Sequence, residues 1–272
     1  MKMKTLSEIF ETGQQAATIQ KYLKLSGLQD RTLESLEAAD LVTFAEIVRH
    51  HLCQSSSKTI LSTFSAALRR YGSPLDFSAV FRLRCVKPTK IFLSEAEIAK
   101  IAAVQPQNRA EDYAKTLFLI CAKTGTRISD ALQLTSLNIQ DGVLSYVSQK
   151  TSTEAAVPVS PTTAKLIQKL SLMKHKYTLA HYNNCIRSLA DNAGIRQEVQ
   201  VFSAGKKEKG PKWQFVSSHT ARRSFATNLY LRGCDIYDIS KMMGHSSTAM
   251  TNGYISSPTR NLTEKTLAFF RD

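Results

Sequence analysis

The sequence predicts a mainly helical protein in two domains, with one small β-hairpin in the second domain. Three observations support this fold class. Apolar residues recur at helical spacing over most of the chain, two short alternating segments flank a polar turn, and an aperiodic basic stretch separates two helical regions. With 272 residues, the chain is long enough for one large domain or two ordinary ones.

The first domain is predicted over residues 1–88 and consists of short helices. The predicted helix that follows Ser57 has one apolar face and ends at Gly72. Residues 73–90 follow without periodicity and contain two prolines and several basic side chains, which is typical of an extended linker. We therefore place the domain boundary near residue 88.

The second domain, residues 89–272, is predicted to begin with a well-marked helix. Ser94 and Glu97 have the spacing of a capping box, in which each side chain bonds to the backbone N–H of the other residue. A strongly apolar helix over residues 113–125 follows. Further helices are expected near residues 129–134, 161–173 and 179–193, and from residue 218 onward.

A small hairpin interrupts these helices. Residues 143–149 alternate as a strand with one buried face does, residues 155–160 are predicted to form a second short strand, and a polar turn joins the two. Lys150 lies at the end of the first strand. Residues 202–214 are rich in lysine and glycine and are predicted to form a basic loop.

The charge of the chain indicates a polyanionic partner. The formal net charge is +14 and the sequence pI is about 9.6. Residues 1–85 contain 11 basic and 8 acidic residues, so most of the positive excess lies in the second domain. An excess of this size is typical of proteins that bind nucleic acid, although solubility alone is the simpler explanation.

The cysteines, the apolar segments and the N-terminus indicate in which cellular compartment the protein is located. Its five cysteines are scattered and form no C-x-x-C pair, so we expect reduced, mostly buried thiols. No apolar run is long enough to span a membrane, and the N-terminus lacks the apolar core of a signal peptide. The sequence therefore predicts a cytoplasmic protein with no membrane partner.

A set of polar residues in the second domain is suited to phosphodiester chemistry. His219 and Arg222 are three residues apart on a predicted helix and so share one face. Guanidinium groups donate paired hydrogen bonds to phosphate oxygens, an ammonium can protonate a leaving oxygen, and a phenol can attack phosphorus. The complete set is Arg127, Lys150, His219, Arg222, His245 and Tyr254.

Taken singly, each member of this set has an ordinary structural explanation. A His-x-x-Arg pair on a helix is common, and Tyr254 alone would be an aromatic residue of the core or of an interface. A metal site is disfavoured, because the histidines lack any tight ligand spacing. Only the order and spacing of the whole set point to a specific chemistry.

In order and spacing, these residues resemble the tyrosine recombinases, also called phage integrases, over residues 90–256. The resemblance implies that residues 1–88 form a helical core-binding DNA domain, and that residues 89–272 form the catalytic domain with a C-terminal tail segment. It implies a role for each residue of the set: the two arginines are Arg127 and Arg222, the mobile lysine is Lys150, the histidines are His219 and His245, the nucleophile is Tyr254, and the supporting carboxylate is Asp130.

The activity implied by the resemblance is site-specific DNA recombination. Tyr254 would attack a DNA phosphate, form a 3′-phosphotyrosyl link and release a 5′-hydroxyl, and the 5′-hydroxyl of another duplex would then attack that link. The bond energy is retained, and the sequence has neither a P-loop nor a carboxylate cluster for Mg²⁺. We therefore expect no cofactor and no metal. Integration, excision, inversion and dimer resolution all remain open, as does the target sequence.

The expected partners are double-stranded DNA and further copies of the chain, which would form a tetramer on paired sites. Residues 261–272 have an amphipathic pattern, and the resemblance favours docking of this segment on a neighbouring subunit over packing on its own subunit. Whether accessory DNA-bending proteins take part is left open.

Two other functions compete with recombination. A type IB topoisomerase would use similar chemistry on one strand and would relax supercoils without site preference. A non-catalytic DNA-binding regulator would need only the basic surface, and the complete set of polar residues argues against it.

Overall fold

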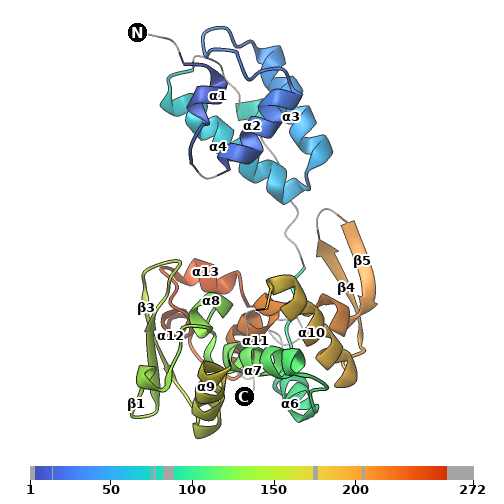
Figure 1. Cartoon of the computed structure of the whole chain (residues 1–272), viewed down its shortest axis with the longest axis vertical. Coiled ribbons are helices and arrows are strands. Elements are labelled where there is room, and N and C mark those ends of the chain that lie inside the picture. The colour runs from blue at the N-terminus through green and yellow to red at the C-terminus, as the bar shows by residue number, and fades with distance from the viewer. Residues whose placement is uncertain are drawn as a thin grey trace, which may run out of the picture. The chain divides into compact units, whose positions relative to one another are not determined.

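The computed structural model describes residues 4–13, 15–73, 75, 78–81, 89–173, 177–203 and 206–255. The chain divides into two compact units (Figure 1). One unit comprises residues 1–89 with 202–208, and the other comprises residues 90–201 with 209–272. Helices dominate the described part of both, and the sheets are small, which confirms the predicted fold class.

The first unit is a cluster of helices around an aromatic core. Its helices are α1 (Leu6–Ile9), α2 (Ala16–Leu25), α3 (Ala38–His51), α4 (Gln54–Arg70) and α5 (Ser78–Phe81). Phe64 of α4 is fully buried and stacks on Phe44 of α3, with 4.2 Å between ring centroids. Stacked aromatic pairs add stability beyond the apolar area that they bury.

The second unit is built around one central helix. Its helices are α6 (Glu95–Ala103), α7 (Arg109–Thr124), α8 (Ile128–Ala131), α9 (Pro161–Leu172), α10 (Leu179–Asn192), α11 (Ser218–Leu231), α12 (Ile236–Met242) and α13 (Thr248–Asn252), with 3-10 turns η1 (Ser136–Asn138) and η2 (Lys212–Phe215). Helix α7 packs against α9, α10 and α11, as Figure 1 shows. Most of its side chains from Tyr113 onward are apolar, and the helix is buried along most of that part.

Local sequence signals define the ends of these helices. The predicted capping box at the start of α6 is confirmed, since Ser94 N–H donates to Glu97 Oε2 (2.7 Å) and Glu97 N–H donates to Ser94 Oγ (3.2 Å). Helix α7 ends at Gly125, which adopts a left-handed conformation with φ of +69°. Glycine adopts this conformation without steric cost and therefore turns the chain sharply into α8.

The predicted hairpin is confirmed as part of a three-stranded antiparallel sheet. Its order is β1 (Ile139–Gln140), β2 (Val143–Val147) and β3 (Glu154–Pro158). Burial alternates along both hairpin strands, so Leu144 and Tyr146 of β2 face the core with Ala155 and Val157 of β3. Helix α12 contacts β3.

The prediction of a loop over residues 202–214 is wrong for most of that stretch. Strands β4 (Glu198–Ser203) and β5 (Lys206–Pro211) form a two-stranded sheet, and η2 follows directly. Most of β5 is exposed and polar on both faces. Such a strand is held by its backbone ladder and has no apolar alternation by which a sequence could reveal it.

Residues 261–272, for which subunit docking was expected, lie outside the described residues. Within the described part of the chain, no helix combines the length and the apolar character needed to cross a membrane.

The close packing behind Gly125 can be tested by substitution. An added Cβ would lie 2.5 Å from the Phe225 ring, whereas a Cβ at Gly194, also left-handed, would meet no atom within 4 Å. We expect Gly194→Ala to cost about 1 kcal/mol of unfolding free energy, the usual cost of a left-handed alanine. Gly125→Ala should cost at least about 2 kcal/mol, because overpacking adds to that strain.

The measurement is guanidinium unfolding of the full chain, followed by the fluorescence of Trp213. This residue is the only tryptophan of the chain and packs against the core of the second unit. Equal losses in the two variants would contradict the steric role of Gly125.

Candidate active site

A pocket of about 570 Å³ in the second unit gathers most of the predicted site residues. Five of the six candidates line it: Arg127, Lys150, His219, Arg222 and Tyr254. The sixth, His245, lies directly behind Arg222 and bonds to it. Residues that are 127 positions apart in the chain thus share one site, because α11 packs against α7 and the residues after β2 bond to Arg127 and Asp130.

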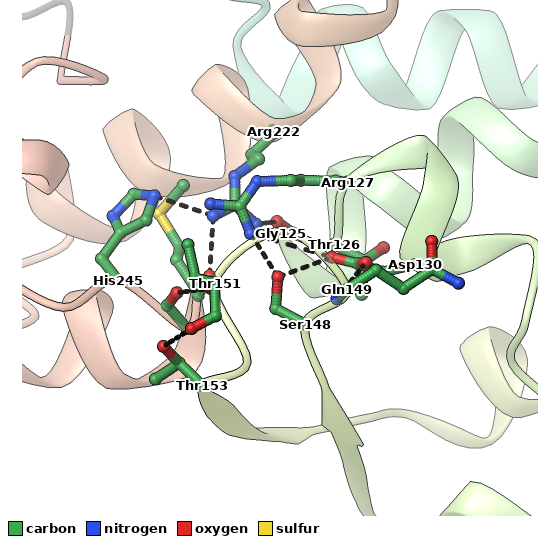
Figure 2. A network of polar contacts seen from close by, with 12 residues as sticks. Gly125, Thr126, Arg127, Asp130, Ser148, Gln149, Thr151, Thr153, Arg222 and His245 are labelled. Atoms are coloured by element: carbon green, nitrogen blue, oxygen red, sulfur yellow. Dashed lines mark hydrogen bonds and ion pairs between the residues drawn. The ribbon is translucent and has the colours of Figure 1, made fainter. Parts of the chain in front are cut away.

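Arg222 is the most deeply placed of these residues, with 1% of its surface exposed. Its guanidinium projects from α11 and donates to three acceptors (Figure 2). These are the Gly125 carbonyl, the Met243 carbonyl at 2.7 Å and His245 Nε2 at 2.8 Å. The three bonds join the end of α7, the end of α12 and the segment before α13 to one planar group.

The positive charge of Arg222 has no acidic partner in the described part of the chain, since no carboxylate oxygen there lies within 4 Å of it. Its buried Nε–H also lacks a hydrogen-bond partner among those residues. Burial lowers the pKa of this guanidinium, and the charge of Arg127 acts in the same direction. A buried cation without a counter-charge is costly, so the site favours binding of an anion.

Arg127 lies at the start of α8, two residues beyond Gly125, and is paired differently. It donates to Ser148 Oγ at 2.7 Å and lies 3.8 Å from Asp130 Oδ2. Asp130 is buried and also accepts from Ser148 Oγ (3.2 Å) and from the Gln149 backbone N–H (3.1 Å). Asp130 therefore holds Arg127 and the end of β2 together without entering the pocket lining.

His245 is buried and acts as a hydrogen-bond acceptor. Because Arg222 can only donate, Nε2 must carry the lone pair, so Nδ1 carries the proton and donates to Thr251 Oγ1 (2.8 Å). Burial, followed by the charges of Arg222 and Arg127, lowers its pKa to about 4. The ring is therefore neutral at pH 7 and orients the Arg222 guanidinium.

His219 lies in the first turn of α11, one helical turn before Arg222, and lines the pocket. Desolvation, followed by the positive charges of Arg223 and Arg222, lowers its pKa. His219 is thus an unprotonated imidazole at neutral pH, which is the form that can accept a proton. The adjacent Arg223 donates instead to the Ile91 carbonyl (2.9 Å).

Tyr254 follows α13 and places its ring on the pocket wall. The ring centroid lies 5.2 Å from that of His245 and 5.5 Å from the guanidinium carbon of Arg222. The ammonium of Lys90 lies 5.9 Å from the same ring and donates to the carbonyl of Gly253, the preceding residue. Contact of an aromatic ring with two cations is favourable and fixes the ring beside the positive end of the pocket.

Lys150 lies in the exposed turn between β2 and β3 and lines the same pocket. The structure thus brings together Arg127, Lys150, His219, Arg222 and Tyr254, with Asp130 and His245 as their immediate supports. Among the residues that the structure describes, no three histidine, cysteine, aspartate or glutamate side chains come together as ligands for a metal ion.

Several groups of the site were not predicted from the sequence. They are the hydroxyls of Ser148 and Thr251 and the backbone carbonyls of Gly125 and Met243. Ser148 had a detectable signal, since it extends the alternation of buried Leu144 and Tyr146, and a polar residue at a buried strand position needs a partner. The backbone carbonyls of Gly125 and Met243 had no signal in the sequence, because every residue has a backbone carbonyl.

The chain is similar to known proteins in sequence and in fold. The sequence model of the phage integrase family matches residues 91–260, and the chain belongs to that family. The chain is 24% identical to tyrosine recombinase XerC of Rickettsia massiliae, covering 85% of this chain and 80% of that protein, and 24% identical to XerC of Rickettsia bellii over the same shares.

Solved structures share the fold. The Tn1549 transposon integrase, in complex with transposon right end DNA, has a TM-score of 0.68 at 15% identity, covering 98% of this chain and all of that one. A lambda integrase dimer bound to a core site has a TM-score of 0.62 at 19% identity, covering 89% of each chain. These similarities confirm the resemblance to tyrosine recombinases that the sequence showed.

The protonation state of His245 makes stability depend on pH. A histidine whose pKa falls from 6.5 unfolded to about 4 folded binds fewer protons when folded, so the protein loses stability as pH falls through that interval. Between pH 7.5 and 5 the loss should be about 2 kcal/mol for this residue.

The test compares the wild-type protein with His245→Gln, whose amide oxygen can still accept from Arg222. Unfolding free energies at both pH values, measured through Trp213, should show a pH-dependent loss that is about 2 kcal/mol larger in the wild-type protein. Parallel losses in the two proteins would mean that His245 is not a neutral acceptor in the folded state.

Proposed function

We propose that this protein is a site-specific DNA recombinase that cleaves and rejoins DNA through a 3′-phosphotyrosyl intermediate. One observation supports this most strongly: a buried arginine with no counter-charge among the described residues, a second arginine and a lysine line one pocket together with a tyrosine. A pocket of this charge suits a phosphodiester, and the tyrosine supplies a nucleophile beside it. Membership in the phage integrase family supports the same activity.

In the proposed reaction, Arg127 and Arg222 bind the non-bridging oxygens and stabilise the charge that develops on them. The Tyr254 oxygen attacks phosphorus, forming one P–O bond while the bond to the 5′-oxygen breaks. His219, neutral at pH 7, accepts the proton of the phenol, and Lys150 donates a proton to the departing 5′-oxygen. The free 5′-hydroxyl of a second duplex then reverses these steps and restores the phosphodiester.

This scheme conserves the number of phosphoester bonds at each step, so it requires no ATP. Asp130 and His245 do not touch the DNA in this scheme. Asp130 orients Arg127, and His245 orients Arg222 through the bond at 2.8 Å. Both are therefore proposed as positioning residues.

The two domains have separate proposed roles. We assign core-type DNA binding to residues 1–88 and catalysis to residues 89–272. The likeness to a lambda integrase tetramer bound to a Holliday junction, with a TM-score of 0.63, supports assembly of four copies on paired sites. DNA as the substrate agrees with the expected cytoplasmic location. Whether accessory DNA-bending proteins assist is left open.

The substitution Tyr254→Phe tests the nucleophile. The phenyl ring preserves the contacts with His245 and Arg222 but lacks the attacking oxygen. We expect the variant to bind DNA as the wild-type protein does and to form no covalent adduct. The measurement incubates each protein with a library of nicked duplexes, isolates denaturant-resistant adducts and sequences the attached DNA.

The sequenced adducts also distinguish the alternatives. Adducts at one recurrent site, followed by joining between two duplexes, support a recombinase. Adducts without sequence preference, accompanied by relaxation of supercoils, would indicate a type IB topoisomerase instead. A wild-type protein that binds DNA and never forms an adduct would be a regulator.

The arginine clamp is tested by Arg127→Lys and Arg222→Lys. A lysine keeps the charge but cannot donate two parallel hydrogen bonds, so cleavage should fall on the order of a hundredfold in each variant. Cleavage rates are measured on the site identified above, and unfolding through Trp213 verifies that each variant is folded. Rates near the wild-type value in a folded lysine variant would exclude a paired contact at that position.

A further inference from the structure

The turn that carries Lys150 is fixed on its N-terminal side to the Arg127–Asp130 pair. The Ser148 side chain is fully buried; its Oγ accepts from Arg127 (2.7 Å) and donates to Asp130 Oδ2 (3.2 Å). The next residue, Gln149, donates its backbone N–H to the other carboxylate oxygen of Asp130 (3.1 Å). Two consecutive residues before Lys150 are thus bonded to α8 rather than only to the strand ladder (Figure 2).

The same turn is fixed on its C-terminal side to the segment that carries His245. Thr151 Oγ1 donates to the carbonyl of Gly244 (3.3 Å), and Thr153 Oγ1 donates to the Thr151 carbonyl (3.1 Å). Gly244 has a φ of +59°, and a Cβ there would lie 3.4 Å from Ala155 Cβ and 3.6 Å from the Thr153 carbonyl. These are ordinary van der Waals distances, so glycine is favoured here by its left-handed backbone conformation, and the two segments lie in direct contact.

These contacts constrain the backbone on both sides of a residue whose own side chain is long and flexible. The turn also closes on itself, since Ser148 N–H donates to the Thr153 carbonyl and Ser152 N–H donates to the Ser148 carbonyl. An exposed polar turn without such bonds opens easily. Fixing the Lys150 backbone limits where its ammonium can reach, and a displacement of about 1 Å in a reacting group can cost on the order of a hundredfold in rate.

We propose that Ser148 and Thr151 are positioning residues for DNA cleavage, which hold the Lys150 turn between the Arg127–Asp130 pair and the Gly244–His245 segment. This inference rests on the proposed recombinase activity. The two hydroxyls differ in a way that can be measured. Among the described residues, Thr151 makes no hydrogen bond to either arginine, so we expect its effect chiefly through Lys150, whereas Ser148 bonds to Arg127 directly and orients it as well as the turn.

The experiment uses two versions of one DNA site, with oxygen or with sulfur as the 5′ bridging atom. A departing thiolate needs no proton, so a defect that acts through Lys150 disappears on the sulfur substrate. A defect that acts through Arg127 persists on both, because the non-bridging oxygens are unchanged. The variants are Thr151→Val, which removes only the hydroxyl donor, Ser148→Ala, and Thr151→Ser, which retains a hydroxyl. Ser145→Ala, at an exposed position of β2, is the control.

We expect Thr151→Val to cleave the oxygen substrate at least about tenfold more slowly and the sulfur substrate at the wild-type rate. Ser148→Ala should be slow on both substrates, with the larger defect on oxygen. Thr151→Ser should restore most of the rate, and the control should match the wild-type protein. An equal defect of Thr151→Val on both substrates, or no defect at all, would overturn the proposal.

A second measurement needs no catalysis and separates this inference from the proposed function. In hydrogen exchange without DNA, the Gln149 amide should exchange at least about tenfold faster in Ser148→Ala than in the wild-type or control protein. Unchanged protection would show that the turn is not held through Ser148, and would overturn the inference. If the wild-type protein formed no adduct on either substrate while this protection was present and lost as expected, the recombinase assignment would fail and the anchored turn would stand.

Discussion

The site depends on the burial of one guanidinium. Arg222 is almost completely removed from water, and its guanidinium donates hydrogen bonds to Gly125, Met243 and His245 instead. Breaking such a set leaves a buried charge uncompensated, which is among the most costly changes a protein can suffer. Each acceptor belongs to a different segment, so the position of Arg222 also fixes the end of α7, the end of α12 and the approach to α13.

The electrostatics of the pocket follow from the burial of Arg222. Burial, followed by the positive charges of neighbouring arginines, lowers the pKa of both histidines and keeps both rings neutral. A neutral His245 can accept from Arg222, and a neutral His219 can accept a proton from a reacting group. The positive charge of the pocket therefore comes from arginine and lysine side chains.

The scaffold gives this arrangement its rigidity. Helix α7 is buried on nearly all sides, and the residues that follow its glycine cap lead directly into Arg127 and Asp130. The packing of Phe225 against Gly125 brings α11 close enough for Arg222 to reach the Gly125 carbonyl. Helix ends and turns thus present the reactive groups, while the packed helices beneath them set the distances.

The sequence by itself determined the helices of the second unit, the hairpin and the family, and it supplied a set of candidate site residues, because periodicity, capping signals and ordered motifs are local properties of a chain. It did not reveal β4 and β5, whose exposed polar strands have no apolar alternation. Only the tertiary structure decided what holds the site residues. Ser148 joins Arg127 to Asp130, Thr151 reaches Gly244, and Arg222 bonds to backbone carbonyls. These contacts join segments that are distant in the chain, and a carbonyl or hydroxyl becomes a specific partner only when packing brings a donor to it.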